Sequence, residues 1–155
     1  MSKCLITGTF DPPTLGHEAI IRRAQSVFDS VAVAILVNPE KDTMFSAEER
    51  VRMLSGVFGE KVQVFFFDGW AVDAAKSVQA DVLVRGIRGM QDVAYEEDMA
   101  RYNREHGMET IFFFADAAVT DVTSTKVRSA LQKGESVKDY LSEDVLRFIE
   151  KYRGK

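Results

Sequence analysis

A histidine near the start of the chain follows a glycine- and proline-containing turn, and both features suit the binding of phosphate groups. Residues 14–17 read Thr-Leu-Gly-His, and residues 8–12 before them read Gly-Thr-Phe-Asp-Pro. We expect a helix to open at His17, where free N–H groups and the positive end of the helix dipole favour an anion. The His17 ring would add an N–H donor or a positive charge. An isolated histidine at a helix start is more often a cap or a surface residue, so the interpretation depends on its partners.

Cationic and hydroxyl side chains occur after other apolar runs of the chain. Lys41 follows the run at 31–37, and Arg85 and Arg88 follow the run at 82–84. Residues 123–125 read Thr-Ser-Thr before a helical pattern, so their hydroxyl and N–H groups could bind a second anion. By itself Lys41 could be a solvated loop cation, and the Thr-Ser-Thr cluster could be an N-cap alone.

The elements that must position these residues alternate along the chain. Five apolar runs without polar alternation predict strands buried on both faces, at 4–6, 31–37, 62–67, 82–84 and 111–114. Helical spacing predicts helices at 17–28, 46–58, 71–78, 92–106, 124–132 and 142–152. The alternation predicts a single domain over residues 1–155, an α/β fold with a doubly wound five-stranded parallel sheet and helices on both faces. Ligands bind such sheets beyond the carboxyl ends of the strands, near the point where strand order reverses.

Composition excludes several classes of partner. The 155 residues carry a formal net charge of −4, from 20 Lys and Arg against 24 Asp and Glu. This balance argues against nucleic acid or an anionic membrane as a partner, since both select basic surfaces. No window approaches the roughly 20 apolar residues of a membrane span. The one cysteine, Cys4, lies in an apolar run, so we expect a buried thiol and a cytoplasmic protein.

Taken together, the motifs resemble those of the nucleotidyltransferase α/β-phosphodiester superfamily, whose mark is His/Thr-x-Gly-His. Further matches lie at 41–50, 84–89, 92–96 and 122–128. In this order they look like the bacterial phosphopantetheine adenylyltransferases, which make dephospho-coenzyme A from ATP and 4′-phosphopantetheine. The resemblance implies a Rossmann-like nucleotidyltransferase domain that uses Mg²⁺ held mainly by phosphates and water, with no metal ligands from the protein. It also implies a homohexamer and coenzyme A as a feedback ligand.

In the implied reaction, the acceptor phosphate attacks the α-phosphorus of ATP and pyrophosphate leaves. A phosphate monoester is already anionic near neutral pH, so catalysis needs positioned donors and cations and no general base. The resemblance implies catalytic roles for His17, Lys41 and Arg85. The residues implied to bind the acceptor are Thr9, Lys41, Ala71 and Arg85. Those implied to bind the nucleotide are Thr9, Phe10, His17, Gly86, Ile87, Arg88, Glu96, Val119, Thr120, Asp121, Val122, Thr123, Ser124 and Thr125.

Two segments depart from the family pattern and leave alternatives open. Residues 69–75 read Gly-Trp-Ala-Val-Asp-Ala-Ala where the family carries Leu-x-Val-x-Phe/Tyr-Ala, and residues 119–124 lack the family's aromatic side chains. A related transferase with another phosphate acceptor, such as nicotinate mononucleotide or glycerol 3-phosphate, is one alternative. A non-catalytic nucleotide-binding module is the other. We expect Trp70 and the two triple-phenylalanine runs to lie in the core or in a subunit contact.

Overall fold

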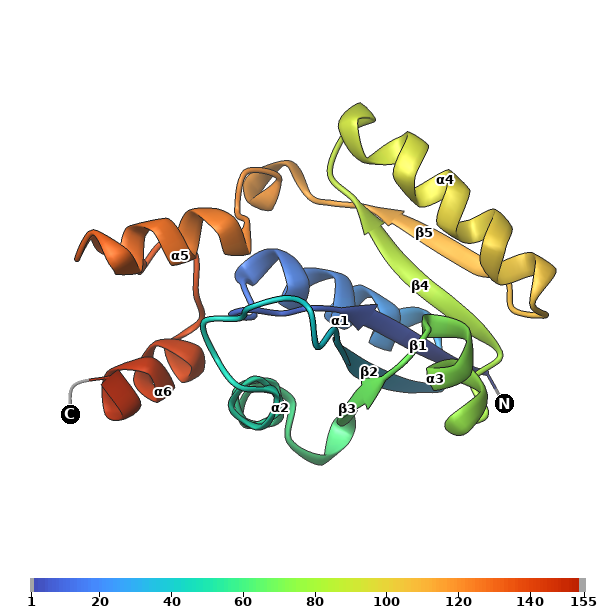
Figure 1. Cartoon of the computed structure of the whole chain (residues 1–155), viewed down its shortest axis with the longest axis horizontal. Helices are drawn as coiled ribbons and strands as arrows, with labels where there is room; N and C mark the ends of the chain where they lie inside the picture. The colour runs from blue at the N-terminus through green and yellow to red at the C-terminus, as the bar shows by residue number, and fades with distance from the viewer. Residues whose placement is uncertain (1, 154–155) are drawn as a thin grey trace.

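Five parallel strands form one sheet in the order β3-β2-β1-β4-β5 in a computed structural model of the chain (Figure 1). The structure describes residues 2–153, so Met1, Gly154 and Lys155 of the predicted domain lie outside the described residues. The strands are β1 (Lys3–Gly8), β2 (Ser30–Val37), β3 (Gln63–Asp68), β4 (Val82–Ile87) and β5 (Thr110–Phe114). All neighbouring pairs are parallel, which confirms the predicted α/β class and sheet type.

Helices alternate with the strands as the spacing predicts. They are α1 (Leu15–Val27), α2 (Ala47–Phe58), α3 (Ala71–Ser77), α4 (Met90–Glu105), α5 (Ser124–Gln132) and α6 (Glu143–Arg153). Two short 3-10 helices, η1 (Gly59–Lys61) and η2 (Ala117–Val119), were not expected from the sequence. The fourth helix begins at Met90, two residues before the predicted start, because the Asp92 carboxylate accepts the backbone N–H of Arg88 at 3.0 Å and organises the first turn.

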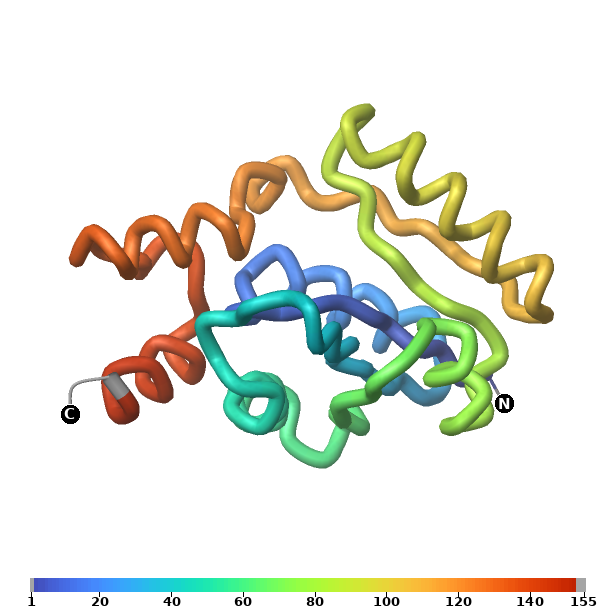
Figure 2. Tube along the Cα trace, in the orientation of Figure 1, coloured from blue at the N-terminus to red at the C-terminus, as the bar shows by residue number. Residues whose placement is uncertain are grey.

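Three apolar clusters explain why the helices lie where they do. Ile21 of α1 and Leu54 of α2 pack on one face of the sheet, and Val72 of α3 packs on the other. A third cluster joins α2, α5 and α6 through buried side chains that include Val127 and Val145. Figure 2 shows that α5 and α6 lie together at one side of the sheet. The last two helices therefore belong to a separate cluster that the strands do not reach.

The expectation that every strand is buried on both faces is wrong for the edge strands. Phe66 of β3 is 51% exposed and Phe114 of β5 is 70% exposed. Both strands lie at the margins of the sheet, where the helices packed on its two faces cover it incompletely. Trp70 is also not a core residue: it is 57% exposed and packs against Tyr102 of α4, with ring centroids 5.1 Å apart.

The composition also predicted a buried thiol at Cys4 and no membrane span, and the structure bears on both. Cys4 is fully buried, and burial raises the pKa of its thiol to about 12, as expected of a small core residue. Within residues 2–153, none of the helices is both long enough and apolar enough to cross a membrane.

The order of strands reverses between β1 and β4, and this is the point at which the predicted site residues meet. Ile6 of β1 pairs with Val84 of β4, so the chain that leaves β1 lies beside Arg85 and Gly86. A Cβ atom on Gly86 would lie 3.0 Å from Cγ1 of Ile20, so the glycine lets α1 pack closely against the end of β4. The start of α1 and the end of β4 are therefore held together at the carboxyl end of the sheet.

Candidate active site

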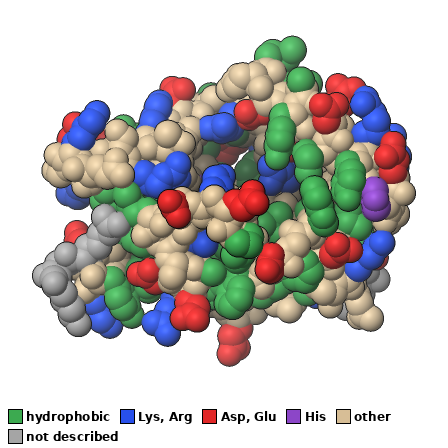
Figure 3. Space-filling model, in the orientation of Figure 1, with side chains coloured by type: hydrophobic (Ala, Val, Ile, Leu, Met, Phe, Trp, Pro, Cys, Tyr) green, Lys and Arg blue, Asp and Glu red, His purple; other side chains and the backbone are tan. Residues whose placement is uncertain are grey.

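A hollow of about 520 Å³ opens at this end of the sheet, with Lys and Arg side chains around its mouth (Figure 3). Most of the predicted site residues line it: Thr9, Phe10, His17, Lys41, Arg85, Gly86, Arg88, Glu96, Val122, Thr123, Ser124 and Thr125. Of the other predicted residues, Ala71, Ile87, Val119, Thr120 and Asp121 are not among those that line it. One cavity thus gathers residues from β1, β4, three helices and the loop after β2.

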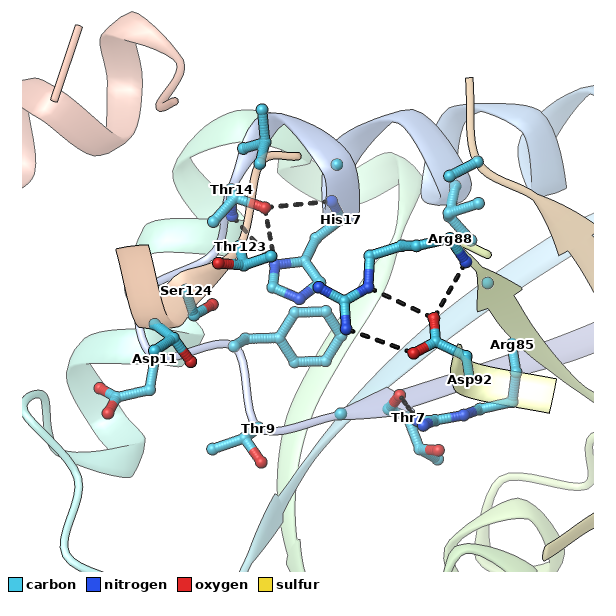
Figure 4. Close-up of a pocket in the computed structure, with 18 of the residues that line it drawn as sticks. Thr7, Thr9, Asp11, Thr14, His17, Arg85, Arg88, Asp92, Thr123 and Ser124 are labelled. Atoms are coloured by element: carbon cyan, nitrogen blue, oxygen red, sulfur yellow. Dashed lines mark hydrogen bonds and ion pairs between the residues drawn. The ribbon is translucent and has the colours of Figure 1, made fainter. Parts of the chain in front are cut away.

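His17 is held by the helix cap that it helps to form. Thr14 is the N-cap of α1, and its backbone N–H donates to Nδ1 of His17 at 3.0 Å (Figure 4). The ring also packs edge-on against Phe10, with centroids 4.7 Å apart. Because Nδ1 accepts a hydrogen bond, the neutral ring carries its proton on Nε2. The cap therefore fixes both the orientation and the tautomer of the ring.

The His17 ring is neutral at physiological pH. Burial is the largest effect, and together with the charges of Arg85 and Arg88 it lowers the pKa of the ring from 6.5 to about 4. Of the two roles that the sequence left open, a positive charge or a ring N–H donor, the structure supports the donor. An uncharged donor placed beside two guanidinium groups is suited to a phosphate oxygen.

We expect the His17 ring to remain neutral on acidification until about pH 4, and NMR of the ring ¹⁵N nuclei can follow this. In the unfolded chain the same ring takes up a proton near pH 6.5, so the folded state loses stability as the pH falls from 6.5 towards 4. His17→Gln should remove that part of the pH dependence, because glutamine does not titrate. A His17 midpoint near 6.5 would contradict the assignment.

Arg85 is fixed at the end of β4 by a buried carboxylate. Its Nη2 lies 2.7 Å from Oε1 of Glu96, and its Nη1 donates to the carbonyl oxygen of Thr7 at 2.7 Å. Glu96 is only 5% exposed, and both of its oxygens accept hydrogen bonds from Arg85. The sequence predicted that Glu96 binds the nucleotide, whereas in this structure its carboxylate contacts the Arg85 guanidinium. Glu96 thus orients the cation that faces the cavity.

Two further arginines of the cavity are also paired with carboxylates. Nε of Arg88 lies 3.4 Å from Oδ2 of Asp92 (Figure 4). Arg128 of α5 lies 3.9 Å from Asp11 and donates to its carbonyl oxygen at 2.8 Å. Arg128 is not among the site residues predicted from the sequence. The spacing of the sequence does point to Arg128, because this residue follows Ser124 by one helical turn and so lies on the same face of the helix.

Asp11 ties two loops of the site together. Its carboxylate is buried and accepts the backbone N–H groups of Met44 at 2.8 Å and Phe45 at 2.9 Å. Arg50 of α2 donates to the carbonyl oxygen of Thr9 at 2.8 Å. These contacts hold the loop after β1 against the segment that carries Lys41, whose exposed side chain lies at the rim of the cavity.

The start of α5 completes the cavity. The hydroxyl of Thr123 accepts the N–H of Lys126 at 3.2 Å, so the N-cap role suggested by the sequence is confirmed for this residue. Ser124 donates its hydroxyl to the carbonyl oxygen of Pro12 at 2.8 Å, which joins α5 to the first loop. Asp121 is exposed and does not line the cavity. The N-termini of α1 and α5 therefore both reach the cavity, where they favour a polyanion such as a polyphosphate.

Comparison with known proteins identifies the family. The family model described as cytidylyltransferase-like matches residues 5–130. A phosphopantetheine adenylyltransferase of Phocaeicola vulgatus is 39% identical over 146 residues, covering 92% of this chain and 97% of the relative. Proteins of the same name from Flavobacterium johnsoniae (40% identical, 86% of this chain and 90% of the relative) and Cereibacter sphaeroides (37%, 96% and 98%) are similarly close. The chain belongs to the cytidylyltransferase-like family and, within it, to the phosphopantetheine adenylyltransferases.

Proposed function

We propose that the chain transfers the adenylyl group of ATP to the phosphate of 4′-phosphopantetheine, giving dephospho-coenzyme A and pyrophosphate. The observation that carries this proposal is that several groups suited to phosphate converge on one cavity. They are a neutral His17, two arginines that are each paired with a carboxylate (Arg85 and Arg88), and two helix N-termini. The name shared by the relatives supplies the identity of the acceptor.

The acceptor phosphate oxygen forms a bond to the α-phosphorus, and the bond from that phosphorus to the bridging oxygen of pyrophosphate breaks. The nucleophile brings its own negative charge, so the protein has to position both phosphates and stabilise charge in the transition state. His17 would donate its Nε2 proton as a hydrogen bond to an oxygen of the α-phosphate. Lys41 and Arg85 would hold the acceptor phosphate from two sides of the cavity.

The nucleotide would extend from His17 towards α5. Thr9 and the backbone N–H of Phe10 would hold phosphate oxygens, and Arg88 would bind phosphate or ribose. Thr123, Ser124 and Thr125 at the start of α5 would receive the β- and γ-phosphates, and we add Arg128 to this group because it lines the cavity on the same helix. Ala71, Ile87 and residues 119–121 lie outside the cavity lining, so contacts from them need a ligand that extends beyond it.

Magnesium would accompany the triphosphate of ATP. Residues 2–153 contain no group of three or more His, Cys, Asp or Glu side chains that could hold a metal ion. Asp11, Asp92 and Glu96 of the cavity are each paired with an arginine. An ion held mainly by phosphate oxygens and water would fit this lining. Such an ion would neutralise charge on the phosphates.

A homo-oligomer, hexameric by family resemblance, is also part of the proposal, as are a cytoplasmic location and coenzyme A as a feedback ligand. The exposed Phe66 and Phe114 on the edge strands support self-association, because apolar side chains on an uncovered strand favour contact with another chain. Size-exclusion chromatography with light scattering tests the oligomeric state.

An assay of ATP-dependent pyrophosphate release tests the activity. We expect turnover with 4′-phosphopantetheine and little turnover with nicotinate mononucleotide or glycerol 3-phosphate. Turnover with one of the other two acceptors alone would overturn the choice of acceptor. ATP binding in calorimetry without turnover on any acceptor would instead indicate a non-catalytic nucleotide-binding module.

A further inference from the structure

The residue that follows His17 carries a buried carboxylate that the proposed reaction does not use. Glu18 is 1% exposed, and its Oε1 lies 3.4 Å from Nη1 of Arg22 in the next turn of α1. Its other oxygen, Oε2, is buried without a hydrogen-bond partner, and the same is true of the hydroxyl of Ser142 just before α6. These are the two buried side-chain atoms in residues 2–153 found without a partner, and the Ser142 side chain lies close enough to the Glu18 carboxyl to lower its pKa.

A second contact joins the same two segments of the chain. The backbone N–H of Leu15 donates to the carbonyl oxygen of Tyr140 at 2.9 Å. Leu141, which follows Tyr140, and Val145 of α6 are buried in the cluster of α2, α5 and α6. The segment at 140–145 is therefore anchored in its own core and meets the first turn of α1 on both sides of His17, at Leu15 and at Glu18.

The environment of Glu18 favours its neutral form. Burial is the largest effect and raises the pKa of the carboxyl, and the charge of Asp144 on α6 raises it further. Ser142 and Arg22 act in the opposite direction, and within residues 2–153 these three residues are the polar and charged groups that act on the carboxyl. A hydrogen bond between Oε2 and the Ser142 hydroxyl would satisfy both unpartnered atoms, because a neutral carboxyl can donate its proton to the hydroxyl and a carboxylate can accept the hydroxyl proton. An ionised carboxylate would face the negative charge of Asp144.

We propose that Glu18 is a positioning residue: its carboxyl bonds to the Ser142 hydroxyl, and through this bond the segment before α6 holds the first turn of α1 and the His17 ring in place. The catalytic part of this inference rests on the proposed adenylyl transfer, whereas the positioning of the ring does not. Ionisation of Glu18 would leave a buried negative charge near Asp144 and so loosen the turn that carries His17.

The titration of the His17 ring tests the proposal without any substrate. In Glu18→Ala and in Ser142→Ala we expect the His17 pKa to rise from about 4 towards its ordinary 6.5, because a loosened turn exposes the ring to water. Ser142→Ala is the milder change, since the hydroxyl has no partner other than the proposed bond to Glu18 and so does not cap α6. Glu18→Gln keeps a donor group at the same place, and the ring should titrate as in the wild type.

Turnover and stability give the second readout. We expect kcat to fall about tenfold in Glu18→Ala while the KM for ATP stays close to wild type, and Glu18→Gln should restore kcat. The raised pKa means that the wild type loses stability as the pH rises above 4.5 through the folded-state pKa, so the stability of Glu18→Gln relative to wild type should increase over that range.

Glu143→Ala is the matched control, because Glu143 is adjacent to Ser142 but is 88% exposed. It should change neither the ring titration nor kcat. A His17 pKa that stays near 4 in both Glu18→Ala and Ser142→Ala would overturn the positioning role, whether or not the protein is active. If the ring titration shifts as expected but no acceptor is adenylated, the positioning role stands and the proposed reaction fails.

Discussion

His17→Ala should lower kcat by about a hundredfold or more, with little change in the KM for ATP, because the Nε2 proton acts on charge that develops in the transition state. Steady-state pyrophosphate release at saturating ATP and acceptor measures the effect. The alanine variant also loses the ring atom that accepts the Thr14 backbone N–H, a group that is buried. Leaving that donor unpaired costs roughly 1–3 kcal/mol of stability, which has to be separated from the catalytic effect.

His17→Gln makes the separation. Glutamine at the third position of a helix can accept the N-cap N–H, as in a capping box, so this variant should recover stability without recovering kcat. His106→Ala is the control for loss of a histidine away from the cavity, because His106 stacks on Tyr102 at the far end of α4. If His17→Ala keeps near-normal kcat in folded protein, the donor role of His17 is wrong.

Arg85→Ala should raise the KM for the acceptor by about a hundredfold and also destabilise the protein. The first effect follows from the loss of a charged donor that would bind the acceptor phosphate, worth about 3 kcal/mol at a desolvated contact. The second arises because Glu96 would remain buried without its cation, and breaking a buried pair in this way typically costs about 3 kcal/mol or more. Acceptor titrations and urea unfolding measure the two effects independently.

Two comparison variants test whether these effects have different origins. The double variant with Arg85→Ala and Glu96→Gln removes the uncompensated charge, so it should recover much of the stability but none of the acceptor affinity. Lys41→Ala should raise the acceptor KM with little loss of stability, because the Lys41 side chain is exposed at the cavity rim. An acceptor KM that does not change in either Arg85→Ala or Lys41→Ala would show that the acceptor phosphate binds elsewhere.

Most of the fold could be predicted from the sequence, because the central strands and the helices have strong local hydrophobic patterns. The runs around Leu5, Val33 and Leu83 are buried from both sides and have no polar alternation. At the edges the same type of run is misleading: the phenylalanines of β3 and β5 look like core residues, and only the strand order shows that Phe66 and Phe114 lie on edge strands.

The site was predictable where it depends on segments of contiguous sequence, and unpredictable where it depends on pairing between elements. The 14–17 motif located His17, but only the fold shows that the Thr14 N–H selects its tautomer. Glu96 was expected to bind the nucleotide. Its pairing with Arg85 could not be predicted, because Arg85 lies on another element, eleven residues away. Ala71 and Ile87 were expected in the site from resemblance, and the cavity lining does not include them.

The pairing of each cavity arginine with a carboxylate has a consequence for how ATP reaches the site. Arg85, Arg88 and Arg128 are balanced by Glu96, Asp92 and Asp11, and at the rim Lys41 is followed directly by Asp42. With His17 neutral, the lining carries almost no excess charge, so it exerts little long-range attraction on an approaching polyanion. The rate of ATP association should therefore depend only weakly on ionic strength. Selection then occurs at contact range, where fixed donors distinguish a triphosphate from the simple anions around it.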